Sequence, residues 1–151
     1  MTIICYRDGI MAADSFSFVG EVRWCGTFPK IARGQFNGVR GVAGASGAAA
    51  IGGAFLEWFG SVAAKVPFDA KIKNEGDFSG IAALVDGTVW RWDSHLMPYR
   101  EFSPFYVDGS GGDVALGAMA FGASAEEAVR VCCEFHAFCG GDVTVLRLHE
   151  D

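Results

Sequence analysis

Three side chains near the start of the chain, Thr2, Asp14 and Lys30, are of types that can cooperate in nucleophilic catalysis. A threonine hydroxyl is a poor nucleophile until a base takes its proton. A free α-amino group on the same residue can be that base, because its ordinary pKa of ~7.7–8.0 leaves a neutral fraction at physiological pH. A nearby lysine would favour the neutral amine by charge repulsion, and an aspartate would hold the lysine in place. Removal of Met1 would therefore make Thr2 a candidate nucleophile.

The segment 1–15 must bring these groups together, and its pattern predicts a hairpin. Apolar arms at residues 3–6 and 10–13 flank Asp8-Gly9, a dipeptide typical of tight hairpin turns. The returning arm is expected to place Asp14 beside Thr2. Taken separately, such charged residues are more often solvated at the surface, so the hypothesis depends on their pairing.

A glycine-rich segment supplies a candidate oxyanion site. A strand over residues 39–43 is expected to end in the segment 44–47, and a buried helix is expected over residues 48–66. Backbone N–H groups at a strand-to-helix turn can stabilise an oxyanion, and we expect Gly44 to lie at that turn. A simple tight turn is the alternative.

The composition fits one domain spanning residues 1–151. Hydrophobic residues make up 51% of the chain and the mean hydropathy is +0.27, which favours burial of surface in a homo-oligomer. The net charge of -6 without a basic cluster argues against nucleic acid. Neither a secretory signal nor a membrane span is expected, and a cytoplasmic location is predicted.

The cysteines give no sign of a metal or cofactor site. Their number is odd and no C-x-x-C spacing occurs, so we expect reduced and mostly buried thiols. A zinc site built from cysteines and histidines is an alternative with little support. The turn at residues 109–112 lacks the lysine and spacing of a P-loop, so nucleotide binding is not expected.

The expected order of elements is strand hairpins, a buried helix, another hairpin, two helices and a last strand. No helix is expected between the early strands, which excludes a parallel doubly wound sheet. We predict an α+β fold in which two mainly antiparallel sheets pack together and helices form the outer layers. The remaining predicted elements are a hairpin within residues 15–33, strands at 81–85, 88–92 and 143–148, helices at 114–121 and 124–137, and irregular chain at 93–104.

Taken in order, the motifs resemble those of the N-terminal nucleophile hydrolases of the proteasome β-subunit and HslV class, especially small forms from phages and prophages. The resemblance covers nearly the whole chain. It implies a four-layer αββα sandwich, self-association into rings, and peptide-bond hydrolysis by an N-terminal threonine. The motifs are RDGIMAADS at 7–15, KI at 30–31, VAGASG at 42–47, GSGGD at 109–113, GASAEEAV at 122–129 and GGDV at 140–143.

The resemblance also assigns roles to single residues. Thr2 matches the nucleophile, Asp14 its acidic partner and Lys30 the lysine. Gly44 matches the oxyanion glycine, and Ser110 matches a serine that helps to hold the terminal amine. Shortening both hairpin arms equally keeps Thr2, rather than the preceding methionine, opposite Asp14.

Four further positions are expected at the site. Val42 and Ser46 would contact the substrate. Where the family usually has an aspartate and a hydroxyl residue at the amine end, this chain has His136 and Cys139. The histidine would weaken catalysis, change its pH dependence or mark its loss, unless it is a helix-end residue placed by the helix dipole.

The leading hypothesis is a self-compartmentalising threonine peptidase that acts on peptides or unfolded proteins. Its expected partners are further copies, in a ring or stacked rings, and an ATP-dependent unfoldase. Two alternatives stay open: an amidase of the same fold that acts on small amides, and a catalytically weak or inactive assembly or interaction subunit, which His136 and Cys139 favour.

Overall fold

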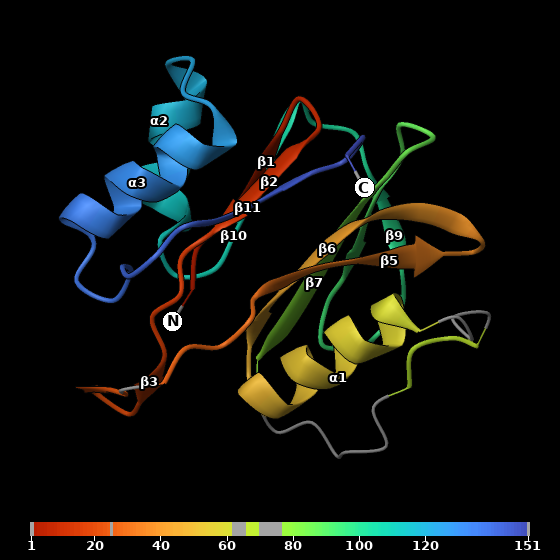
Figure 1. Ribbon diagram of the computed structural model, residues 1–151, viewed down its shortest axis with the longest axis horizontal. Coiled ribbons are helices and arrows are strands. Elements are labelled where there is room, and N and C mark those ends of the chain that lie inside the picture. The colour runs from red at the N-terminus through yellow and green to blue at the C-terminus, as the bar shows by residue number, and fades with distance from the viewer. Residues whose placement is uncertain (1, 25, 62–65, 70–76, 151) are drawn as a thin grey trace.

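In the computed structural model, the predicted N-terminal hairpin is formed by β1 (Ile4–Arg7) and β2 (Ile10–Ala13) (Figure 1). The structure describes residues 2–24, 26–61, 66–69 and 77–150. Asp8 and Gly9 have φ angles of 51° and 79°, as a type I′ turn requires. Ile3 and Cys5 point toward the helix layer on one face, whereas the intervening Ile4 points into the other sheet.

Two antiparallel sheets form the centre of the molecule. The first has the strand order β10-β1-β2-β11 and the second β5-β6-β7-β8-β9. A small hairpin, β3 and β4, stands apart at the end where the N-terminus lies (Figure 1). The remaining strands are β3 (Phe18–Val19), β4 (Val22–Arg23), β5 (Ile31–Phe36), β6 (Val39–Gly47), β7 (Phe78–Leu84), β8 (Val89–Trp92), β9 (Tyr99–Glu101), β10 (Phe105–Asp108) and β11 (Thr144–Arg147).

Helices cover the outer face of each sheet, which gives the predicted αββα order. The helices α2 (Gly112–Ala120) and α3 (Ala125–Phe135) lie on the first sheet, and α1 (Ala49–Gly60) lies on the second (Figure 1). Three apolar clusters fill the interfaces between adjacent layers. The predicted capping box is present at the start of α3, where Ser124 and Glu127 bond reciprocally at 3.1 and 3.0 Å.

Several predicted boundaries are wrong, and two of these errors come from strand pairing that local patterns do not show. The strand predicted at 39–43 continues to Gly47 as β6, because β7 pairs with it as far as that residue. The helix predicted to reach Val66 ends at Gly60, after which Ser61 is extended. The segment 93–104 contains the edge strand β9, paired with β8. Most of the polar segment 71–77 lies outside the described residues.

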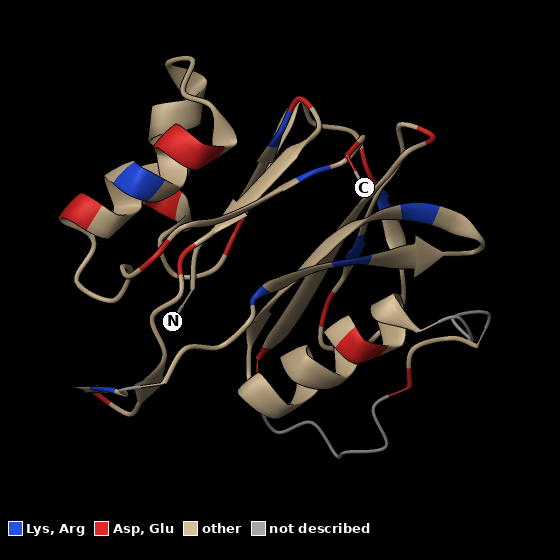
Figure 2. Cartoon of the chain, viewed as in Figure 1, with Lys and Arg blue, Asp and Glu red and all other residues tan. Residues whose placement is uncertain are grey.

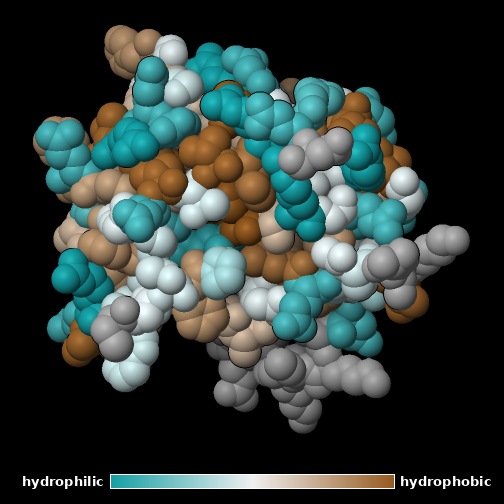
Figure 3. Space-filling model, in the orientation of Figure 1, coloured by the Kyte–Doolittle hydropathy of each residue, from teal (hydrophilic) through white to brown (hydrophobic). Residues whose placement is uncertain are grey.

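Charged residues are spread over the helices, turns and strand ends, with both signs along α3 (Figure 2). Apolar side chains reach the surface across the middle of the face drawn in Figure 3. Two groups of large apolar side chains are exposed. The group around the β3–β4 hairpin consists of Val19, Val22, Trp24 and Phe28. The group on the α2–α3 layer consists of Leu116, Phe121 and Phe135. Within the described part of the chain, no helix is long and apolar enough to cross a membrane.

Candidate active site

The backbone of Thr2 is held by the glycine-rich turn that follows β10. Thr2 lies just before β1 and is 7% exposed. Its nitrogen, here the peptide nitrogen joined to Met1, donates to Ser110 Oγ at 3.3 Å, and the Gly111 N–H donates to the Thr2 carbonyl at 3.4 Å. Gly109 has a φ of 101°, and a Cβ there would collide with the Thr2 carbonyl, so only glycine permits this approach.

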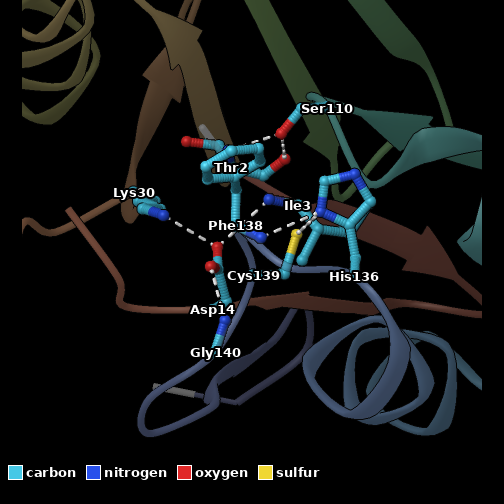
Figure 4. Close-up of polar contacts among 9 residues, drawn as sticks. All are labelled: Thr2, Ile3, Asp14, Lys30, Ser110, His136, Phe138, Cys139 and Gly140. Atoms are coloured by element: carbon cyan, nitrogen blue, oxygen red, sulfur yellow. Dashed lines mark hydrogen bonds and ion pairs between the residues drawn. The ribbon is translucent and has the colours of Figure 1, made fainter. Parts of the chain in front are cut away.

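Asp14 accepts hydrogen bonds from three directions and is fully buried. Its Oδ1 accepts from the Ile3 N–H at 3.1 Å and from Lys30 Nζ at 2.8 Å, and its Oδ2 accepts from the Gly140 N–H at 3.2 Å (Figure 4). The side chains of Lys30 and Asp14 are 6% and 0% exposed. A buried carboxylate needs such partners, because water no longer solvates it.

The strand register differs by one residue from the predicted one. Ile4 pairs with Ala13, and the Asp14 N–H donates to the Ile3 carbonyl at 3.3 Å. Asp14 therefore lies opposite Ile3 rather than directly opposite Thr2. Its carboxylate binds the amide that follows Thr2, and so it still lies beside the candidate nucleophile.

The expectation that Gly44 marks the strand-to-helix turn is wrong. Gly44 lies within β6, paired with Ile31 on one side and Ile81 on the other, and a Cβ there would press against Ile4 between the sheets. The turn is at Gly47, which ends β6 with a φ of 97°. A local glycine signal could not separate these two positions.

The Gly47 N–H points to the edge of β6 that faces Lys30. N–H directions alternate along a strand, and the Ala45 N–H donates to the Lys30 carbonyl at 3.0 Å. Gly47 lies two residues further on, past the end of β5, which begins at Ile31. This amide therefore points to the edge beside the cavity described next.

A cavity of about 270 Å³ opens beside Thr2 and Lys30. Ser46 and Gly47 line it, as does Ala45. The predicted substrate contact of Val42 is wrong, because Val42 is completely buried in the cluster between the sheets. The other lining residues come from the segment before β5 and from α1, and are mostly apolar: Phe16, Ser17, Phe18, Phe28, Pro29, Ala48, Ala49, Gly52, Gly53 and Leu56.

His136 and Cys139 organise the loop after α3. His136 Nδ1 accepts from the Phe138 N–H at 3.2 Å and lies 3.6 Å from Cys139 Sγ (Figure 4). Burial, together with the charge of Asp14, raises the pKa of Cys139 to about 12, so its thiol is neutral and can donate to the imidazole. This loop leads directly to Gly140, which binds Asp14.

Among the described residues, no hydrogen bond joins His136 to Thr2 or Ser110. Across the same part of the chain, no three His, Cys, Asp or Glu side chains gather as a metal site would require. Cys5, Cys132, Cys133 and Cys139 are free, and the fifth cysteine lies outside the described residues.

Sequence reasoning missed the contributions of Gly140, Gly109 and Gly47. The backbone N–H of Gly140 binds Asp14, and the backbone of Gly109 packs closely against the Thr2 carbonyl. No side-chain pattern in the sequence indicates such backbone contacts. The sequence contains one signal for Gly47, since it is the last glycine before the apolar run of α1. Of the site residues predicted from the sequence, the structure brings together Thr2, Asp14, Lys30 and Ser110. Ser46 lines the adjacent cavity.

No family model and no curated protein sequence matches the chain. Solved structures do match over its length. A BPH from Thiobacillus denitrificans, solved in complex with epoxomicin, aligns with a TM-score of 0.66 and 20% identity over 99% of each chain. Eukaryotic HslV from Trypanosoma brucei aligns at 0.61 and 18% over 97% of this chain and 98% of that one.

A glycine mutant of Anbu from Hyphomicrobium sp. strain MC1 aligns with a TM-score of 0.70 and 11% identity, over 99% of this chain and 82% of that one. These proteins have N-terminal nucleophile folds of the proteasome type. The likeness confirms the predicted α+β fold of two antiparallel sheets between helix layers.

Proposed function

We propose that this chain is a threonine peptidase whose nucleophile is Thr2, exposed by removal of Met1. The observation that carries the proposal is the buried Lys30–Asp14 pair, whose lysine lines a cavity together with Thr2. The Thr2 nitrogen donates a hydrogen bond to Ser110 Oγ. A hydrolase needs a nucleophile, a base and an oxyanion donor in one place, and we assign these roles to the Thr2 hydroxyl, the Thr2 amine that loss of Met1 would free, and the Gly47 N–H.

The reaction follows from the placement of these groups. The Thr2 hydroxyl attacks the substrate carbonyl carbon, and the free Thr2 amine takes the hydroxyl proton. The carbonyl oxygen becomes negative and is stabilised by the Gly47 N–H. Collapse of this intermediate breaks the peptide bond, the departing amine takes the proton, and an ester on Thr2 remains. Water, deprotonated by the same amine, then hydrolyses the ester.

The lining of the cavity supports substrates with a bulky apolar side chain before the cleaved bond. Phe16, Phe18 and Phe28 line the cavity together with Leu56. Among the described residues that line the cavity, Lys30 is the only charged one, and its ammonium group is paired with the Asp14 carboxylate. A charged substrate side chain would therefore lose its hydration without gaining a partner.

We extend the proposal to a homo-oligomer. Phe121 is 98% exposed on the α2–α3 layer, and Phe135 is 72% exposed. Exposed aromatic side chains of this size favour contact with another protein surface, and further copies of the chain are the simplest partners.

The test is hydrolysis of fluorogenic peptides by the full chain. Peptides with Phe or Leu before the cleaved bond should be hydrolysed faster than those with Asp or Lys. Thr2→Ala should abolish the activity, and Thr2→Ser should retain part of it. Thr88→Ala, in the remote β7–β8 turn, is the matched control. Equal rates for wild type and Thr2→Ala would overturn the proposal.

A further inference from the structure

A second buried carboxylate, Asp108, lies close to the candidate site and has no role in the reaction described above. Asp108 ends β10 of the first sheet and is 8% exposed. The Ser46 hydroxyl donates to its Oδ1 at 3.1 Å, and a guanidinium nitrogen of Arg91 lies 3.7 Å from the same oxygen. Ser46 belongs to β6 and Arg91 to β8, so this cluster joins the two sheets.

The surroundings of Asp108 are apolar, which makes a carboxylate there costly. Asp108 pairs with Ile4 across the first sheet, and Ile4 packs with Val42 and Ile81 between the sheets. Asp108 Oδ2 and Arg91 Nε have no hydrogen-bond partner in the described structure. An incompletely satisfied buried ion pair contributes little to folding stability compared with an apolar side chain, so stability alone does not explain Asp108.

The neighbours of Asp108 along the chain connect it to both halves of the site. Gly109 and Ser110 follow it directly, and these residues contact the Thr2 backbone. Ser46 directly precedes Gly47, whose N–H is the proposed oxyanion donor. The Ser46–Asp108 hydrogen bond therefore ties the turn that holds the nucleophile to the turn that would hold the oxyanion.

We infer that Asp108 is a positioning residue that fixes the distance between Thr2 and the Gly47 N–H, through the hydrogen bond that it accepts from Ser46. The inference rests on the proposed peptidase function for its kinetic consequence. Its structural consequence, coupling between the two turns, is independent of activity. A positioning error of about 1 Å at a reacting centre can cost on the order of 10²-fold in rate.

Kinetics of four variants test the first consequence. Asp108→Ala and Ser46→Ala should each lower kcat by about ten- to a hundredfold with a smaller change in KM, because oxyanion stabilisation acts in the transition state. Asp108→Asn keeps an oxygen that accepts from Ser46 and should restore much of kcat. The Ser46→Ala/Asp108→Ala double variant should be no slower than Asp108→Ala alone. Ser79→Ala is the control, since Ser79 lies opposite Ser46 on the same face.

Amide hydrogen exchange of the full chain tests the second consequence without activity. Ser46→Ala, on the second sheet, should speed exchange of the Gly111 amide on the first, and Ser79→Ala should not. Exchange confined to the neighbourhood of Ser46, or wild-type kcat in Asp108→Ala, overturns the inference. Coupled exchange in a chain that hydrolyses no peptide would instead support the positioning role and count against the peptidase.

Discussion

Lys30 and Asp14 form the most completely buried ion pair near Thr2 in the described structure. Asp14 is bound by two backbone amides as well as by the lysine. Removal of one member of such a pair leaves a charge without a partner in an environment that water does not reach. The pair therefore links the stability of the chain to the geometry of the site.

Replacement of the lysine tests this link. Lys30→Ala should lower the free energy of unfolding by about 3–5 kcal/mol, because the Asp14 carboxylate remains buried without its counter-ion. Urea denaturation followed by circular dichroism measures the change. Arg147→Ala, which removes an exposed partner of Glu150, is the control and should cost less than about 1 kcal/mol. A loss at Lys30 as small as that of the control would show that the pair is not buried.

Because the buried thiol of Cys139 stays neutral in the fold, the free energy of unfolding should depend on pH in the alkaline range. The ordinary thiol pKa of 9.0 rises to about 12 in the fold. Above pH 9 the unfolded chain loses this proton while the folded chain keeps it, so stability falls as the pH rises from about 9 to about 12. Melting temperatures at pH 8 and pH 10.5 should differ less in Cys139→Ser than in wild type. An equal difference in both proteins would contradict this placement.

At the scale of elements, the sequence predicted what local signals determine. The Asp8-Gly9 turn defines the first hairpin, and the capping box defines the start of α3. The extent of β6 depends on its pairing with β7, which is distant in sequence, and the many small residues of β6 predicted a turn instead. The oxyanion position was consequently placed at Gly44, whereas pairing carries the strand to Gly47.

The same dependence on tertiary contacts explains the other differences at the site. Thr2, Asp14 and Lys30 could be predicted because their side chains are chemically distinctive, whereas Ser110 was assigned by the family resemblance alone. Gly140 could not, because it acts through a backbone amide whose position is set by the loop after α3.

Helix α1 offers a prediction about specificity. Gly53 lines the cavity, and a Cβ there would meet no atom within 4 Å. Gly53→Ala should therefore stabilise the chain by about 0.5–1 kcal/mol through helix propensity. Gly53→Leu should narrow the cavity and lower kcat/KM for peptides with Phe before the cleaved bond more than for peptides with Ala. An unchanged ratio would place the substrate side chain elsewhere.

At the scale of the whole molecule, the exposed aromatic side chains of the α2–α3 layer predict assembly. Sedimentation at micromolar concentration should give a mass several times the 16.0 kDa of one chain. Phe121→Glu should reduce that mass, because a charge replaces an exposed ring that another copy would cover. Glu134→Gln, an exposed change on α3, should not. A wild-type chain that sediments at 16.0 kDa would rule out the homo-oligomer.

The central claim, that Thr2 is a free N-terminal nucleophile, is tested most directly by mass spectrometry of the chain treated with epoxomicin. Such an epoxyketone reacts with a threonine that has both a free hydroxyl and a free α-amine. We predict an intact mass without Met1, an increase equal to one inhibitor, and an adduct mapped to Thr2 by peptide sequencing. Retention of Met1, or no adduct under conditions that label a proteasome, would contradict the account.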